Sequence, residues 1–289
     1  MRPSVGDQLL ERARDAARPV LGPACRRIRR EAQWHDPRAR FAHYRDASGP
    51  FPHRVTGHAT PLVRALAGLD PQLQSNKAVN LAIAAGCIDG LVVAPGERFS
   101  FWLLVGRPTQ ARGFLDGLVL DHGALSRGIG GGLCQMTNLL YWMSLHTPLT
   151  VVERWRHSYD VFPDAGRTQP FGTGATCAWP VLDLQIENRT TSAYRLSVGV
   201  TPTELQGAWE AMEEFPGAFE VYERAHVITH EGAGRYIRHN QVWRREFSAG
   251  GRLVGESPIA ENHALLMYAP FLGAGVDGAE SSEPSDAPD

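Results

Sequence analysis

Apolar and polar positions along the chain predict helices in the first half and strands in the second. Apolar side chains recur at helical spacing over Asn76–Ala85, with Ser75 or Asn76 placed to cap the helix and Gly86 just beyond its end. A second helix is predicted over Leu133–Leu145. Its core stripe, at positions i, i+3, i+4 and i+7, consists of Met136, Leu139, Leu140 and Met143.

Between and after these helices the pattern changes to extended structure. Residues 91–93 and 98–102 lie on either side of turn residues 94–97, which predicts a strand, a tight turn and a second extended segment. Apolar and polar side chains then alternate strictly over 182–187 and 194–200. Because side chains of a strand point to opposite faces in turn, this alternation around a turn predicts a β-hairpin.

The β-rich half continues towards the C-terminus. Residues 219–229 and 236–254, with a turn at 249–251, predict a further pair of strands. Residues 37–61, rich in His, Pro and Gly, predict an irregular lead-in instead. From residue 273 onward the chain is rich in Gly, Ser, Pro and acidic residues, which predicts a disordered tail.

These elements predict an α+β protein in which a central helix, preceded by a Gly-rich turn and carrying a cysteine, packs on a mainly antiparallel β-sheet. We divide the chain into a basic helical N-terminal arm (1–36), a main domain (37–272) and a disordered acidic tail (273–289). Within the main domain, the candidate motifs occupy 75–200 and the β-rich part occupies 180–272.

The composition is that of an ordinary globular chain, with 289 residues, 43% hydrophobic residues and a formal net charge of −2. No segment approaches the roughly 20 apolar residues of a membrane-spanning helix, and no secretory signal precedes the first helix, so we expect a cytoplasmic protein. Four widely spaced cysteines without a CxxC pair argue against a disulfide framework and against structural zinc. We therefore expect no metal and no cofactor.

Basic residues are concentrated at the N-terminus, where the first forty residues hold ten Arg and five acidic residues. Helices are predicted over 8–17 and 24–34. A solvated helical arm explains this charge, and a weak contact with an anionic membrane surface is the alternative. Nucleic-acid binding is not expected, because no aromatic residues are interleaved with the arginines.

The candidate chemistry centres on Cys134, which follows three glycines at the predicted start of a helix. Unpaired amides and the positive end of the helix dipole stabilise a thiolate there, and the same amides form an oxyanion hole, to which Gln135 adds a side-chain donor. His157 is the candidate general base, and Asp160 or Asp164 is available to orient it.

Three points limit this candidate site. His146 lies one helix length from Cys134, too far to be its base if the helix is continuous. A cysteine after glycines is also compatible with simple packing. The glycines lack the Gly-Lys-Ser/Thr ending of a nucleotide-binding P-loop. The remaining candidate ligand-binding residues are Gly130, Gly131, Gly132, Asn138 and Ser100.

Several motifs resemble those of the VanW family. They are PGERFSFW (95–102), residues 112–118, GGGLCQMTN (130–138), residues 139–142 and LHTPLT (145–150). The resemblance covers about residues 75–200 and identifies 37–272 as a VanW-like domain of the short type. It implies an accessory part in glycopeptide resistance or cell-envelope metabolism, and it does not supply a reaction.

Two functions follow from these residues. In the first, Cys134 is the nucleophile of an acyltransferase or amidohydrolase acting on a cell-wall precursor peptide. In the second, the Gly-rich turn binds a peptide carboxylate, or a partner protein of the resistance cluster, without turnover. Both predictions involve the same turn, and they differ in whether the thiol is required.

Overall fold

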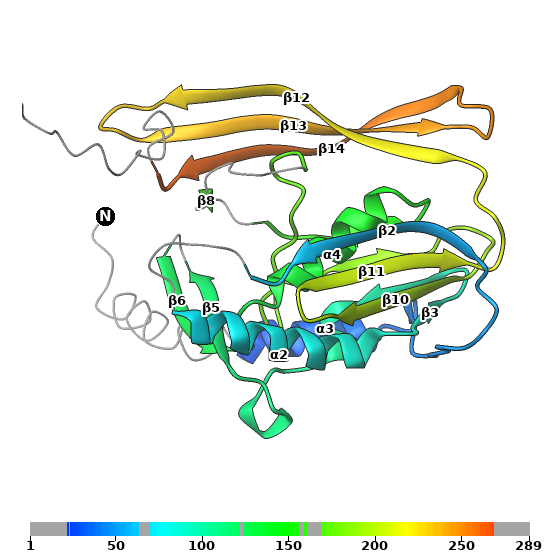
Figure 1. Ribbon diagram of the computed structural model, residues 1–289, viewed down its shortest axis with the longest axis horizontal. Coiled ribbons are helices and arrows are strands. Elements are labelled where there is room, and N and C mark those ends of the chain that lie inside the picture. Colours follow the sequence, from blue (N-terminus) through cyan, green and yellow to red (C-terminus); the bar gives the residue numbers. More distant parts are fainter. Residues whose placement is uncertain are drawn as a thin grey trace, which may run out of the picture.

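A computed structural model describes Gly22 and residues 24–63, 70–121, 124–156, 159–160 and 169–268. It is a mixed α+β fold with many strands and few helices, which confirms the predicted class (Figure 1). The helices with described bounds are α2 (Pro71–Ile88), α3 (Phe101–Val105), the 3-10 helix η1 (Gln110–Arg112) and α4 (Cys134–Leu145). The predicted tail from residue 273 lies outside the described residues.

Most strands pair antiparallel, and they form several sheets instead of one. One sheet contains β1 (Arg40–Phe41), β4 (Glu97–Ser100), β9 (Gln185–Glu187) and β7 (Thr150–Glu153). A second contains β2 (His53–Pro61), β11 (Glu204–Ala211), β10 (Tyr194–Val200) and β3 (Val92–Val93). A third contains β12 (Ala218–His230), β13 (Tyr236–Phe247), β14 (Leu253–Leu266) and β8 (Tyr159–Asp160). A separate ribbon contains β5 (Asp116–Asp121) and β6 (Ala124–Ile129).

Helix α2 begins earlier than the pattern predicts. Asp70 is its N-cap and accepts a hydrogen bond from the Gln72 amide, and Pro71 occupies the first turn, where its missing N–H costs nothing. Gly86 lies inside the helix, because the turn after Ile88 ends it instead. The prediction that Gly86 follows the helix end is therefore wrong.

The segment 91–102 follows its prediction up to Ser100. Strand β3, a turn with a positive φ at Gly96 and strand β4 follow in order. The chain then turns into α3, since the Ser100 hydroxyl caps this short helix by accepting from the Leu103 amide.

Two strand predictions are wrong. Residues 37–52 are irregular apart from the short strand β1, as predicted, but residues 53–61 form β2, which pairs antiparallel with β11. The predicted hairpin of 182–187 with 194–200 does not form either. Strand β9 pairs with β4 and β7, whereas β10 pairs with β11 and β3. The Asn188 side chain donates to the carbonyls of Val93 and Ser192, and it holds the chain where it leaves one sheet for the other.

The C-terminal strands form a long sheet above the rest of the molecule (Figure 1). Strands β12, β13 and β14 are 13, 12 and 14 residues long, and they pair in sequence order. The predicted turn at 249–251 connects β13 to β14. The pattern did not predict that β14 continues to Leu266.

The second predicted N-terminal helix, residues 24–34, is present and is attached to the core. Arg30 is buried and forms an ion pair with Glu153, with N–O distances of 2.7 and 2.5 Å. Trp34 donates to the Ser100 hydroxyl and packs against Trp179. This part of the predicted arm is therefore not a freely solvated helix. The predicted helix over 8–17 lies outside the described residues.

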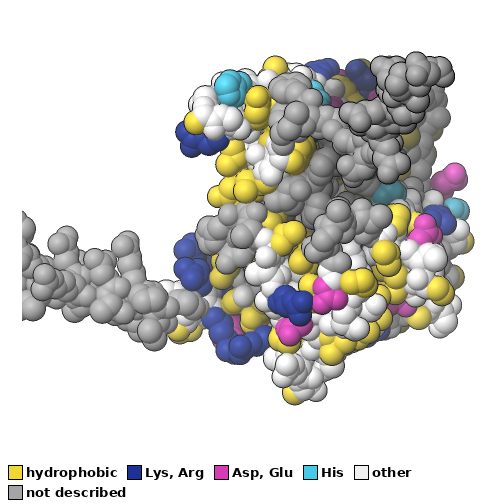
Figure 2. Space-filling model, turned by 60° about the vertical axis from the view of Figure 1, so that its left-hand side comes forward, with side chains coloured by type: hydrophobic (Ala, Val, Ile, Leu, Met, Phe, Trp, Pro, Cys, Tyr) yellow, Lys and Arg dark blue, Asp and Glu magenta, His cyan; other side chains and the backbone are white. Residues whose placement is uncertain are grey.

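The main hydrophobic core lies between α2, α4 and the first two sheets. Its largest fully buried side chains include Trp209, Phe99, Phe101, Phe114, Met136 and Leu139. On the surface, hydrophobic side chains are dispersed among polar and charged ones (Figure 2). Among the described residues, no helix is both long enough and apolar enough to cross a membrane.

Candidate functional site

The glycine run fixes the approach of the chain to α4. The backbones of Gly131 and Gly117 touch, so a side chain at either position would overlap the other chain segment. Gly132 has a φ of 91° and packs against the aliphatic part of Lys77. The glycines are therefore required for close packing at the start of α4.

Several amides of this turn are already engaged. The amide of Gly130 donates to the Leu115 carbonyl and that of Gly131 to the Gly128 carbonyl, both at 3.0 Å. Asn80 donates to the Gly131 carbonyl at 2.9 Å. The Gln135 amide donates to the Gly132 carbonyl. These bonds show that most of the glycine run has a structural role. Only the amides nearest Leu133 are left to face a ligand.

Cys134 is the first residue of α4, and its thiol lies beside a second cysteine. The Cys177 thiol donates to Cys134 Sγ at a distance of 3.8 Å, and the Cys134 thiol donates to the Cys177 carbonyl oxygen at 3.6 Å. Burial raises the pKa of the Cys177 thiol well above its usual range, and the neighbouring Cys134 sulfur raises it further. Cys177 therefore remains a protonated hydrogen-bond donor at neutral pH.

The segment that carries Cys177 is held on one face of α4. Thr137 donates to the Ala175 carbonyl at 2.6 Å, and the Asn138 side chain accepts from the Ala175 amide at 2.6 Å. Asn138 was a candidate ligand-binding residue, and its side-chain oxygen makes this structural bond. The two bonds fix the position of the thiol pair.

Gln135 and Ser100 have structural partners of their own. The Gln135 amide nitrogen donates to the Thr60 hydroxyl and the Pro61 carbonyl, both at 2.9 Å, which attaches α4 to β2. Ser100 is buried, and its hydroxyl donates to Asp183 at 2.6 Å. Burial also raises the pKa of Asp183. Neither side chain is directed at Cys134 by these bonds.

The candidate base and its orienting residue are not brought together within the described residues. His157 and Asp164 lie outside them. Asp160 is buried in β8, where it forms an ion pair with Arg238 at 3.2 Å and accepts from the Tyr268 hydroxyl at 3.0 Å. Asp160 therefore connects β8 to the C-terminal sheet.

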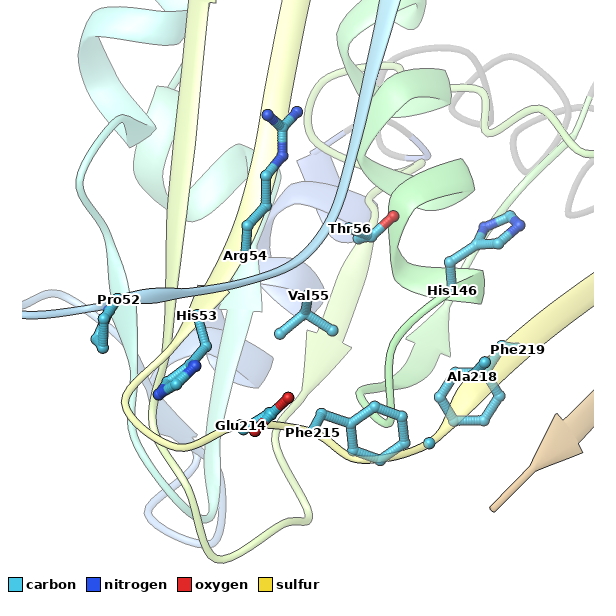
Figure 3. A pocket seen from close by; sticks show the side chains of 11 residues that line it. Pro52, His53, Arg54, Val55, Thr56, His146, Glu214, Phe215, Ala218 and Phe219 are labelled. Atoms are coloured by element: carbon cyan, nitrogen blue, oxygen red, sulfur yellow. The ribbon is translucent and has the colours of Figure 1, made fainter. Parts of the chain in front are cut away.

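His146 caps the opposite end of α4 from Cys134, as predicted from the helix length. It lines a cavity of about 440 Å³ together with β2 and the segment that leads into β12 (Figure 3). Burial lowers the pKa of His146, and its ring packs against Trp142. Cys134 does not line this cavity.

Metal-ligating side chains are dispersed. Among the described residues, no group of three or more His, Cys, Asp or Glu side chains is arranged to hold a metal ion.

Comparisons with known proteins identify the chain. A model of the VanW-like protein family matches residues 76–209. The vancomycin B-type resistance protein VanW of Enterococcus faecalis (strain ATCC 700802 / V583) is 32% identical over 217 residues, which cover 75% of this chain and 78% of that protein. The chain belongs to the VanW family.

A second relative matches over a shorter stretch of the chain. The uncharacterized protein YoaR of Bacillus subtilis (strain 168) is 34% identical over 110 residues, which cover 38% of this chain and 35% of that protein. No solved structure matches the chain.

The VanW family match covers the thiol site and ends before the C-terminal sheet. It begins in α2 and ends at Trp209 in β11, so it includes the glycine run, Cys134 and Cys177. The motif residues singled out in the sequence thus lie in the matched part. Cys177 was not predicted as a site residue, since a separation of 43 positions from Cys134 gives no spacing signal.

Proposed function

We propose that this VanW-family chain is an accessory factor in glycopeptide resistance or cell-envelope metabolism, and that Cys134 is its nucleophile towards an acyl group of a cell-wall peptide. The name of the 32% identical relative supports the biological setting. The observation that carries the chemistry is the position of Cys134 in the first turn of α4, with the protonated Cys177 thiol donating to its sulfur.

Both features favour a negatively charged sulfur, whereas the bond from the Cys134 thiol to the Cys177 carbonyl is lost when the sulfur gives up its proton. A hydrogen bond to the charged form of a group stabilises that form, and the N-terminal end of a helix carries a partial positive charge. An amide near Leu133 is suited to receive the oxygen that becomes negative when a carbonyl carbon is attacked. Cysteine is the strongest nucleophile among the side chains of this turn.

The reaction requires a base and a leaving group. His157 takes the proton from Cys134, the thiolate attacks the carbonyl carbon, and the C–N bond breaks. The proton then passes from His157 to the leaving amine. Water, or the amine of an acceptor, attacks the resulting thioester and releases Cys134. His157 enters this scheme as a proposal from its residue type and chain position.

Alkylation by iodoacetamide over a range of pH tests the proposal, with each cysteine followed by peptide mass spectrometry. We expect Cys134 to react well below pH 8, whereas exposed Cys25 serves as the internal reference. The reactivity should decrease in Cys177→Ser and in His157→Ala. If Cys134 reacts no faster than Cys25 at low pH, the proposal that Cys134 is a nucleophile is contradicted.

Function in cells supplies the second test. A Cys134→Ser variant should lose the accessory activity in a host whose resistance depends on this chain. Full activity in that variant contradicts a nucleophile and favours the alternative, in which the chain binds a peptide or a partner protein without turnover. Circular dichroism of both proteins controls for folding.

A further inference from the structure

A second cavity lies where the later half of α4 and strand β7 face β13 and β14. Its volume is about 540 Å³, within the range of small-molecule sites. Its walls combine aliphatic with polar residues, and three of the polar groups can bind an anion. These groups are Tyr141 from α4, Arg154 from the end of β7 and Arg244 from β13.

The two arginines have no carboxylate partner among the described residues. Arg195 and Arg245 differ in this respect, since they pair with Glu210 and Glu256 at 2.8 and 3.0 Å. Burial lowers the pKa of both Arg154 and Arg244, and the charge of nearby Glu246 offsets this only partly at Arg244. A partly buried guanidinium group without a carboxylate partner is a strong donor for an anion.

Other contacts hold these donors in position before any ligand binds. The Arg154 guanidinium donates to the carbonyls of Gly172 and Gly174 and lies 4.7 Å from the centre of the Tyr141 ring. Arg244 lies 4.6 Å from the centre of the Phe219 ring and contacts the Thr147 carbonyl at 3.4 Å. Such fixed donors bind a ligand at a smaller entropic cost.

Tyr141 adds an observation that is independent of the charges. The residue is only 3% exposed, yet its hydroxyl has no hydrogen-bond partner among the described residues. The hydroxyl oxygen is not one of the fully buried unpaired atoms of the described residues, so it is open to the cavity and can bond to a ligand there. Arg154 and Arg244 are both close enough to act on its pKa. A ligand oxygen between the three groups would satisfy the hydroxyl.

The acidic groups of the lining limit the charge of the ligand. Glu153 is neutralised by Arg30 at 2.5 Å, and Glu261 is exposed at the rim. Two arginines beside these acids suit a single negative charge better than a doubly charged phosphate. The aliphatic walls, formed by Leu145, Leu149 and Ile259 among others, suit the apolar part of a small amino acid.

We infer that this cavity binds the terminal carboxylate of a short peptide through Arg154, Arg244 and Tyr141. Tyr141 lies seven residues after Cys134 on the same face of α4, about 10 Å along the helix at 1.5 Å per residue. An extended peptide spans that distance with about three residues. The link between this carboxylate and attack by Cys134 rests on the proposed function, whereas the binding itself does not.

Isothermal titration of the full chain carrying Cys134→Ala tests the binding without turnover. The probes are N-acetyl-dialanine with a free carboxylate and the same peptide as its C-terminal amide. We expect the acid to bind saturably and the amide to bind at least about tenfold more weakly, because the amide lacks the charge that the arginines compensate. Arg244→Gln should lower the affinity for the free-carboxylate peptide by a similar factor.

Two further variants make the test specific. Arg245→Gln, the neighbouring arginine with carboxylate partners, should leave the affinity unchanged. Tyr141→Phe should lower the affinity for the free-carboxylate peptide by a smaller factor. This variant replaces Arg244→Gln in the test if Arg244→Gln does not fold. Arg154 is left intact because it also holds Gly172 and Gly174.

Four results overturn the inference. They are equal affinities of acid and amide, no effect of Arg244→Gln in a folded protein, no saturable binding of the acid at millimolar concentration, and preferential binding of inorganic phosphate. If the acid binds as expected but Cys134 proves unreactive, the binding site stands and the proposed reaction fails. If Cys134 proves reactive but the free-carboxylate peptide does not bind, the proposed reaction stands and this binding site is contradicted.

Discussion

The part of the chain that matches the VanW family and the C-terminal sheet are stabilised in different ways. The matched part contains nearly all of the main hydrophobic cluster, built around side chains such as Phe99, Met136 and Trp209. The described C-terminal sheet supplies only three buried hydrophobic residues, Val242, Ala264 and Leu266, and none belongs to that cluster.

The C-terminal sheet depends on pairing and on polar contacts instead. Its three long strands form antiparallel ladders interrupted by bulges, and buried Asn240 and Asn262 bond to each other at 2.8 Å. Exposed ion pairs around Glu256 add little, because solvent screens them. Residues of the two regions meet at the cavity that Tyr141, Arg154 and Arg244 line. The sheet can therefore contribute to ligand binding without being part of the main core.

The largest expected effect is in the core. Phe99 is fully buried in β4, and Phe99→Ala should lower the free energy of unfolding by about 3–5 kcal/mol, since it removes buried apolar surface and leaves a cavity. Denaturant unfolding followed by tryptophan fluorescence measures it. A loss below about 1 kcal/mol would contradict the central place of this cluster.

The second largest effect is expected at the thiol pair, which lies in the part of the chain that matches the VanW family. Diamide, which takes up the two protons and two electrons, should join Cys134 and Cys177, because their sulfur atoms are 3.8 Å apart. A disulfide across 43 positions should stabilise the core by about 2–4 kcal/mol. Thiol titration and denaturant unfolding measure the two effects, and Cys177→Ser is the control. Thiols that both remain titratable in the folded protein would contradict the pairing.

A smaller effect is expected in the C-terminal sheet. Asn262 is fully buried, donates to Asn240 and accepts from Arg156 at 3.1 Å. Asn262→Ala should cost about 1–3 kcal/mol, because it leaves buried polar partners without bonds. Hydrogen exchange should increase in β13 and β14 while α4 stays protected. Ser257→Ala, at an exposed position of β14, is the control, and equal deprotection of α4 would show that the two regions unfold together.

The sequence predicted the elements whose signals are local. The i, i+3, i+4 stripe identified α4, and the turn at 94–97 identified the step from β3 to β4. Strand β2 was missed because HRVTGHATP contains a single large apolar residue, Val55, and its pairing with β11 decides its structure. The false hairpin shows that alternation identifies a strand without identifying its partner.

The candidate site was predictable to a similar extent. The glycine run and the helix start pointed to Cys134, and they are adjacent in sequence. Cys177 and Arg244 come from segments far from α4 in the sequence, and their proximity to Cys134 and Tyr141 depends on the packing of α4 against the segment 172–178 and against β13. A single sequence carries no spacing signal for such contacts. The same limit applies to Asp160, which pairs with Arg238 of the C-terminal sheet.

The smallest expected effect concerns the bulge in edge strand β12. Ala225 has a φ of 51°, where the register with β13 shifts, and an L-residue in this region costs about 1–2 kcal/mol that glycine does not pay. Because glycine loses about 0.5–1 kcal/mol more chain entropy than alanine, Ala225→Gly should stabilise the protein by less than about 1 kcal/mol. Ala218→Gly, at the start of the same strand without a positive φ, should destabilise it slightly. Thermal unfolding of both variants measures the difference, and equal losses would mean that the bulge does not strain the sheet.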